Sequence, residues 1–85
     1  MTADELRQVI LNVLLRIAPE ADLATLDPDV NLRDQLDLDS VDFLNFVLGL
    51  HKELGVEVAE KDYPKFATLS GCIGYLTTST KTANP

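Results

Sequence analysis

The sequence contains one cysteine, one histidine and no tryptophan. A single cysteine forms no internal disulfide, and together with one histidine it does not supply the ligands of a zinc site. Cys72 has apolar neighbours such as Leu69 and Ile73, which predicts a buried, unreactive thiol. The lack of disulfides favours a reducing compartment, so we predict a cytoplasmic protein.

Long hydrophobic runs are also absent. The segment 1–17 is interrupted by four charged residues, so it does not have the apolar centre of a secretory signal. No apolar run approaches the about 20 residues that a membrane-spanning helix needs, and we predict no membrane insertion. The 85 residues make one small domain, which buries only roughly 60% of its unfolded surface. We expect a monomer.

Basic residues are scarce in the segment 20–42, which we call the acidic segment. It holds eight carboxylates against Arg33 alone, and this difference of seven charges equals the net charge of the whole chain, −7. Such a concentration of negative charge repels nucleic acid and anionic lipid and favours partners with basic faces. The alternative is a solvated loop that the charge keeps soluble.

No alternating strand pattern is present, and apolar residues recur instead at helical spacing. The segment 3–17 predicts an amphipathic helix that starts at a capping box of Thr2 and Glu5 and stops before Pro19. The segment 18–38 has no sustained period, so we predict a long loop with room for one short helical turn. Five apolar residues are expected to anchor this loop to the core: Leu23, Leu26, Val30, Leu32 and Leu36.

A second helix is predicted from Asp39 or Ser40 to Leu54, with Gly55 as its C-cap. Its apolar residues are too many for one face. One stripe is expected to face the core: Phe43, Phe46, Val47, Leu50 and Leu54. The other stripe is expected to be an exposed docking surface, unless surrounding helices bury both: Val41, Leu44 and Leu48.

The rest of the chain predicts two more helices. A short one is expected over 60–63, ended by Pro64, and a last one starts at a cap of Thr68 or Ser70. The fold class is therefore all-α: a small four-helix bundle of three longer helices and one short helix, with a long loop between the first two. We expect the domain to span 1–78 and the polar segment 79–85 to be a disordered tail.

The stretch "LDLDSVDF" (36–43) places one serine among aspartates at the start of the second helix. A calcium loop starting at Asp37 would need a glutamate as its twelfth residue, where Leu48 stands. A catalytic serine would need a base within hydrogen-bond reach. The single histidine, His51, lies roughly 16 Å further along the helix. We therefore predict no catalytic residue and no metal site.

Two roles remain open for this stretch. Asp39 and Asp42 have the spacing of a helix cap. Ser40 is also suited to be an attachment point, because the first turn of a helix presents free N–H groups and partial positive charge that favour a phosphate.

The chain resembles the acyl carrier protein family over about residues 3–78. The resemblance rests on "LRDQLDLDSVDFLNFVLGLHKELGVEV" followed by "ATLSGCIGYL", and its signature is Asp39-Ser40-Val41. It implies a non-catalytic carrier whose Ser40 receives a 4′-phosphopantetheine arm from coenzyme A, with Asp39 helping to position the metal-dependent transfer. The resemblance implies a phosphopantetheinyl transferase and an acyl ligase, acyltransferase or ketosynthase-type enzymes as partners, and it implies that Val41, Leu44 and Leu48 face them. We expect the acids Asp37 and Asp42 to take part in this docking as well.

The sequence also departs from the family pattern. Asp37 stands where the family usually has glycine, and Asn45, His51 and Lys52 stand where the housekeeping fatty-acid carriers have acids. These departures favour a specialised carrier in fatty-acid, polyketide or related biosynthesis. Peptidyl and D-alanyl carriers share the same fold and serine, and an interaction module without an arm is a further alternative.

Overall fold

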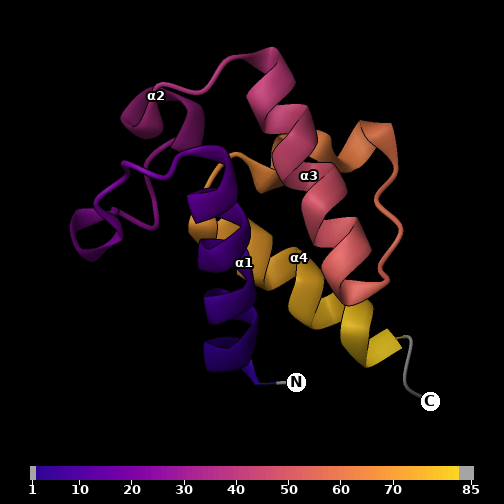
Figure 1. The fold of residues 1–85 in the computed structure, drawn as a ribbon. Coiled ribbons are helices and arrows are strands. Elements are labelled where there is room, and N and C mark those ends of the chain that lie inside the picture. The colour runs from indigo at the N-terminus through magenta and orange to yellow at the C-terminus, as the bar shows by residue number, and fades with distance from the viewer. Residues whose placement is uncertain (1, 83–85) are drawn as a thin grey trace.

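The computed structural model describes residues 2–82, with side chains to residue 78, and every regular element within them is a helix (Figure 1). This confirms the predicted all-α class. The elements are α1 (Ala3–Ile17), η1 (Leu23–Thr25), α2 (Leu32–Leu36), α3 (Ser40–Leu54), η2 (Glu60–Phe66) and α4 (Leu69–Thr82). Helix α1 packs against α3 and α4, and η2 packs against α4.

The first helix forms where the capping pattern and the apolar period predicted it. The Glu5 N–H donates to the Thr2 hydroxyl at 3.1 Å, and the Thr2 N–H donates to the Glu5 carboxylate at 2.8 Å. These bonds satisfy backbone donors that a helix start leaves free. Leu6, Ile10 and Leu14 are fully buried on the inner face, so hydrophobic burial fixes which side of α1 faces the core.

The core is continuous and apolar. Helix α3 contributes Phe46, Val47 and Leu50, which are buried as predicted, while Phe43 and Leu54 are partly buried against them. Among the residues with described side chains, no polar or charged residue is buried. Further core residues come from the loop, η2 and α4: Leu26, Leu32, Leu38, Phe66, Leu69, Cys72 and Leu76.

The connection from α1 to α3 is more ordered than a plain loop, because it contains η1 and α2. Leu26 and Leu32 anchor it as predicted, but the prediction for Val30 is wrong: its side chain is 42% exposed. Val30 lies in a surface turn, and its backbone carbonyl oxygen accepts a hydrogen bond from the Gln35 side-chain amide at 2.9 Å. The residue missed as an anchor is Leu38, which is 7% exposed.

Hydrogen bonds tie this connection to the start of α4. The Leu32 N–H donates to the Ala67 carbonyl at 2.7 Å, and the Ser70 N–H donates to the Pro28 carbonyl at 2.9 Å. The Ser70 hydroxyl donates to Asp29, and Thr68 rather than Ser70 caps α4, through the Gly71 N–H at 3.0 Å. These hydrogen bonds hold the segment before α3 against the start of α4.

Two element ends differ from the prediction. Pro64 does not end the short helix, because η2 continues to Phe66. The fully buried Phe66 ring packs 5.0 Å from the Tyr75 ring, and this burial outweighs the hydrogen bond that proline lacks. Helix α4 continues to Thr82, into the segment predicted as a tail, and residues 83–85 lie outside the described part.

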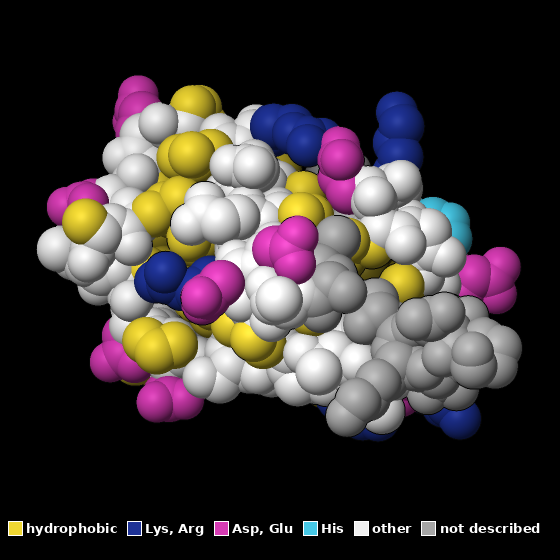
Figure 2. Space-filling model, turned by 90° about the horizontal axis from the view of Figure 1, so that it is seen from below, with side chains coloured by type: hydrophobic (Ala, Val, Ile, Leu, Met, Phe, Trp, Pro, Cys, Tyr) yellow, Lys and Arg dark blue, Asp and Glu magenta, His cyan; other side chains and the backbone are white. Residues whose placement is uncertain are grey.

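Helices α1 and α3 begin at opposite ends of the bundle (Figure 1). Helix α3 begins at the top of Figure 1, and α1 begins at the bottom. Seen from below, acidic and basic side chains are scattered among hydrophobic ones (Figure 2). No described helix is long and apolar enough to cross a membrane.

The close approach of η2 and α4 generates a stability prediction. A Cβ on Gly71 would lie 2.3 Å from the Lys65 backbone carbonyl oxygen, so Gly71→Ala forces the backbone apart. We expect a loss of about 1–3 kcal/mol in the free energy of unfolding, measured by urea denaturation. Gly74 in the same helix has no described atom within 4 Å of such a Cβ, so Gly74→Ala should gain about 0.5–1 kcal/mol. Equal effects of the two substitutions would contradict the packing described.

Candidate functional site

The site begins at the turn between α2 and α3. Asp37 ends α2 in the left-handed conformation, with φ 54° and ψ 47°. A side chain costs roughly 1–2 kcal/mol in this conformation, where glycine is at ease and aspartate is tolerated. This geometry is consistent with the glycine that the resemblance implies at this position, and it shows how aspartate serves here.

Two aspartates then start α3. The Asp42 N–H donates to Asp39 Oδ1 at 2.8 Å, and the Asp39 N–H donates to Asp42 Oδ2 at 3.3 Å. This reciprocal pair confirms the predicted cap. Because each carboxylate accepts a hydrogen bond from a backbone N–H at this end, the helix begins directly after Asp39, at Ser40.

Ser40 is exposed in the first turn of α3. Its hydroxyl oxygen accepts a hydrogen bond from Arg33 Nη2 at 3.3 Å. A guanidinium is a permanent donor and does not take up a proton at neutral pH, so this neighbour does not activate the hydroxyl as a base would. His51 is engaged elsewhere, with Nδ1 2.8 Å from the Val56 carbonyl oxygen.

Arg33 is the residue that sequence reasoning missed. It lies seven positions before Ser40, on α2, and the turn at Asp37 folds it back onto the start of α3. The one available signal was compositional, since Arg33 is the single base in the acidic segment. Its guanidinium carbon also lies 5.9 Å from the centre of the Phe43 ring.

The second stripe of α3 is exposed, as predicted. Val41 is 64% exposed, Leu44 41% and Leu48 49%. Of the acids assigned to docking, Asp37 is exposed and Asp42 is half-buried. The structure thus presents an apolar stripe flanked by carboxylates next to Ser40, and its use in docking stays a prediction.

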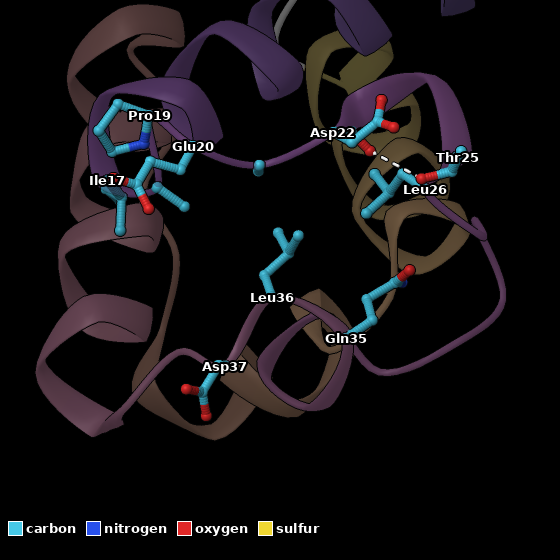
Figure 3. Close-up of a pocket in the computed structure, with 11 residues that line it drawn as sticks. Ile17, Pro19, Glu20, Asp22, Thr25, Leu26, Gln35, Leu36 and Asp37 are labelled. Atoms are coloured by element: carbon cyan, nitrogen blue, oxygen red, sulfur yellow. Dashed lines mark hydrogen bonds between the residues drawn. The ribbon is translucent and has the colours of Figure 1, made fainter.

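Three hollows lie near this surface, and the smallest of them, of about 400 Å³, is lined by Arg33, Asp37 and Leu38 among others. The largest, of about 640 Å³, lies between the end of α1, the loop and α2, with Leu36 pointing into it and Asp37 and Glu20 among the residues around it (Figure 3). The second, of about 450 Å³, is lined by Leu48 and Tyr63 among others, between α3, η2 and α4. No cluster of three metal-ligating side chains occurs in the part of the chain that the structure describes.

The cysteine is not part of the site. Cys72 is fully buried, and this burial raises the pKa of its thiol to about 12. The group is therefore protonated at physiological pH and is a poor nucleophile. This confirms the prediction of a buried thiol.

Comparisons with known proteins agree with this geometry. A family model described as a phosphopantetheine attachment site matches residues 4–76. The chain is 30% identical over 77 residues to an acyl carrier protein of Lactobacillus johnsonii, covering 89% of this chain and 94% of that protein. It is 31% identical over 74 residues to polyketide-8 synthase acyl carrier protein 2 of Streptomyces avermitilis, covering 87% and 79%.

A solved structure shows the same fold. The acyl carrier protein from Enterococcus faecalis superposes with a TM-score of 0.78 at 25% identity, covering 93% of this chain and 99% of that one. With a family model that spans most of its length and a relative covered almost end to end, the chain belongs to the acyl carrier protein family, whose attachment domain implies a covalent 4′-phosphopantetheine cofactor.

Proposed function

We propose that Ser40 receives the 4′-phosphopantetheine arm and that the chain is a specialised carrier of acyl groups in fatty-acid, polyketide or related biosynthesis. The observation that supports this most is the exposure of Ser40 in the first turn of α3, where its hydroxyl oxygen accepts a hydrogen bond from the Arg33 guanidinium. Such a hydroxyl is accessible to a modifying enzyme and has no reactivity of its own.

The attachment is a phosphoryl-type transfer. The Ser40 oxygen forms a bond to the phosphorus of coenzyme A that bears the pantetheine, as the phosphoanhydride bond to the adenosine-side phosphate breaks. Adenosine 3′,5′-bisphosphate leaves, and the hydroxyl proton passes to a base of the transferase. Asp39 is proposed to help position the transferase's metal ion, because its carboxylate lies at the residue before the serine and is exposed.

The residues around Ser40 fit a negatively charged attachment. The first turn of a 15-residue helix has a partial positive charge, and Arg33 adds a full one. When bound, the arm supplies the thiol on which acyl groups form thioesters. The chain's own thiol, Cys72, is buried and does not compete for the cargo.

The docking surface suits brief encounters. Carboxylates steer an enzyme with a basic face towards Ser40, and the exposed stripe of Val41, Leu44 and Leu48 supplies a small apolar contact. We propose that the transferase and an acyl ligase, acyltransferase or ketosynthase-type enzyme bind here in turn. A small interface of this kind releases its partner readily.

The distribution of charge supports a specialised carrier. Asn45, His51 and Lys52 are exposed on α3, so the later turns of this helix are not an acidic face. The acids lie instead in the segment before α3. A cognate enzyme should therefore place its basic residues over the turn at Asp37 rather than along the whole helix. We propose that this exchange takes place in the cytoplasm.

The attachment is tested by intact mass. The apo protein, incubated with a broad-specificity phosphopantetheinyl transferase, magnesium and coenzyme A, should gain the mass of one arm. Ser40→Ala should gain none. A folded wild-type sample that gains no mass would overturn the proposal and favour an interaction module.

The two roles of Asp39 are separable. Asp39→Ala removes the cap and should cost about 1 kcal/mol of stability. Asp39→Asn keeps an oxygen that accepts from the Asp42 N–H but removes the charge, so it should melt close to the wild type while slowing arm addition. Equal rates of arm addition for Asp39→Asn and the wild type would limit Asp39 to capping.

The docking stripe is tested by Leu48→Glu. Since Leu48 is 49% exposed, the substitution should leave the melting temperature nearly unchanged and weaken processing by the cognate enzyme. Leu15→Glu is the matched control, because Leu15 is 38% exposed but lies on α1. A large loss of stability for Leu48→Glu, or equal processing of both variants, would contradict the assignment.

A further inference from the structure

The contacts of the Arg33 side chain are unusual for a basic residue in an acidic segment. The acidic segment holds eight carboxylates, yet no salt bridge to Arg33 forms within the part of the chain that the structure describes. The side chain instead donates to the neutral Ser40 hydroxyl at 3.3 Å and lies 5.9 Å from the centre of the Phe43 ring. The guanidinium charge thus faces the serine hydroxyl and is not paired with a carboxylate among the described residues.

The backbone of Arg33 is held on both sides. Its N–H donates to the Asn31 side chain at 2.8 Å, and its carbonyl accepts from the Leu38 N–H at 3.0 Å. Leu38 is itself buried. The position of the Cα is therefore set by the core, and the cation–π contact with Phe43, 5.9 Å from the guanidinium carbon to the ring centre, favours the observed direction of the guanidinium.

We propose that Arg33 binds the phosphodiester of the arm once Ser40 is esterified, and so fixes the direction in which the arm leaves the protein. This inference rests on the proposed function and names a residue for it. The non-bridging oxygens of such a phosphate lie two bonds from the Ser40 oxygen, within reach of a guanidinium that already contacts that oxygen. The hydrogen bond to a neutral hydroxyl is then replaced by one between two oppositely charged groups, which is shorter and stronger.

The contact between Arg33 and the phosphate is important because nearby carboxylates repel the phosphate. Asp37, Asp39 and Asp42 all lie within three residues of Ser40 in the sequence, and their carboxylates repel a phosphate monoanion. Two of them, Asp39 and Asp42, are occupied with each other's backbone N–H groups. Arg33 opposes the repulsion from the α2 side, so the base of the arm is held towards α2 while the remainder stays free to move.

Arginine suits this task better than lysine. Its planar fork offers two parallel donors to a phosphate and also stacks on an aromatic ring. Lysine at this position would keep the charge but lose the fork and most of the stacking. Arg33→Lys should therefore keep part of the effect, and Arg33→Gln should lose it.

The test compares the apo and arm-bearing protein by NMR. The chain has three arginines, Arg7, Arg16 and Arg33, so its side-chain Nε–Hε spectrum contains three signals, and Arg33→Gln identifies the one that matters. On addition of the arm the Arg33 signal should shift, while those of Arg7 and Arg16 stay in place. The ³¹P signal of the arm should also differ between the wild type and Arg33→Gln, and Arg7→Gln should leave it unchanged.

The outcomes separate this inference from the function on which it rests. An Arg33 signal that does not move when the arm is added overturns the inference and leaves the carrier function intact. A ³¹P signal that moves equally in Arg33→Gln and Arg7→Gln also overturns it, since that is a general effect of charge. If the wild type takes up no arm, the proposed function fails first, as the intact mass shows. If Arg33→Gln does not fold, Arg33→Lys identifies the Arg33 signal, and the wild-type spectra before and after arm addition decide the question.

Discussion

The reciprocal hydrogen bonds between Asp39 and Asp42 are the interaction on which this structure depends, because they decide where α3 begins. A helix that starts at Ser40 turns Phe46, Val47 and Leu50 towards α1 and the core. The same register turns Val41, Leu44 and Leu48 outwards. A start displaced by one residue would rotate both stripes by about 100° and exchange core residues for exposed ones. The start of α3 thus places Ser40 in its first turn and determines which apolar side chains face the core and which form the exposed stripe.

The chain before α3 holds this cap in place. Leu32 and Leu38 are buried on either side of the turn at Asp37, and the connection is hydrogen-bonded to the start of α4. These contacts leave the carboxylates at the surface, where their mutual repulsion is screened by water and salt. The acidic segment is therefore anchored to the core and keeps its charge at the surface near Ser40. Under the proposed function, this charge would steer basic enzymes towards Ser40 without holding them, as a carrier that visits several partners requires.

Sequence reasoning succeeded where the determinants are local. The caps at Thr2 and Asp39, the stop before Pro19 and the inner stripe of α3 follow from spacing along one helix, and the structure confirms each. It failed where contacts beyond a single helix decide the structure. Val30 was expected inside, but a turn closed by Gln35 places it at the surface. Pro64 was expected to stop a helix, but the burial of Phe66 extends it. The contact between Arg33 and Ser40 needs the left-handed turn at Asp37, which no period in the sequence reveals.

The account as a whole requires that one hydroxyl, at the first turn of α3, bears the arm. Cleavage after Arg33 and Lys52 by trypsin releases the peptide 34–52, in which Ser40 is the one hydroxyl-bearing residue. The most direct measurement is therefore a tryptic map of the chain after treatment with the transferase and coenzyme A, analysed by tandem mass spectrometry. We predict that the mass of the arm appears on this peptide and on no other. An arm found on a different peptide, or the peptide 34–52 recovered unmodified from a folded and fully treated sample, would contradict the account.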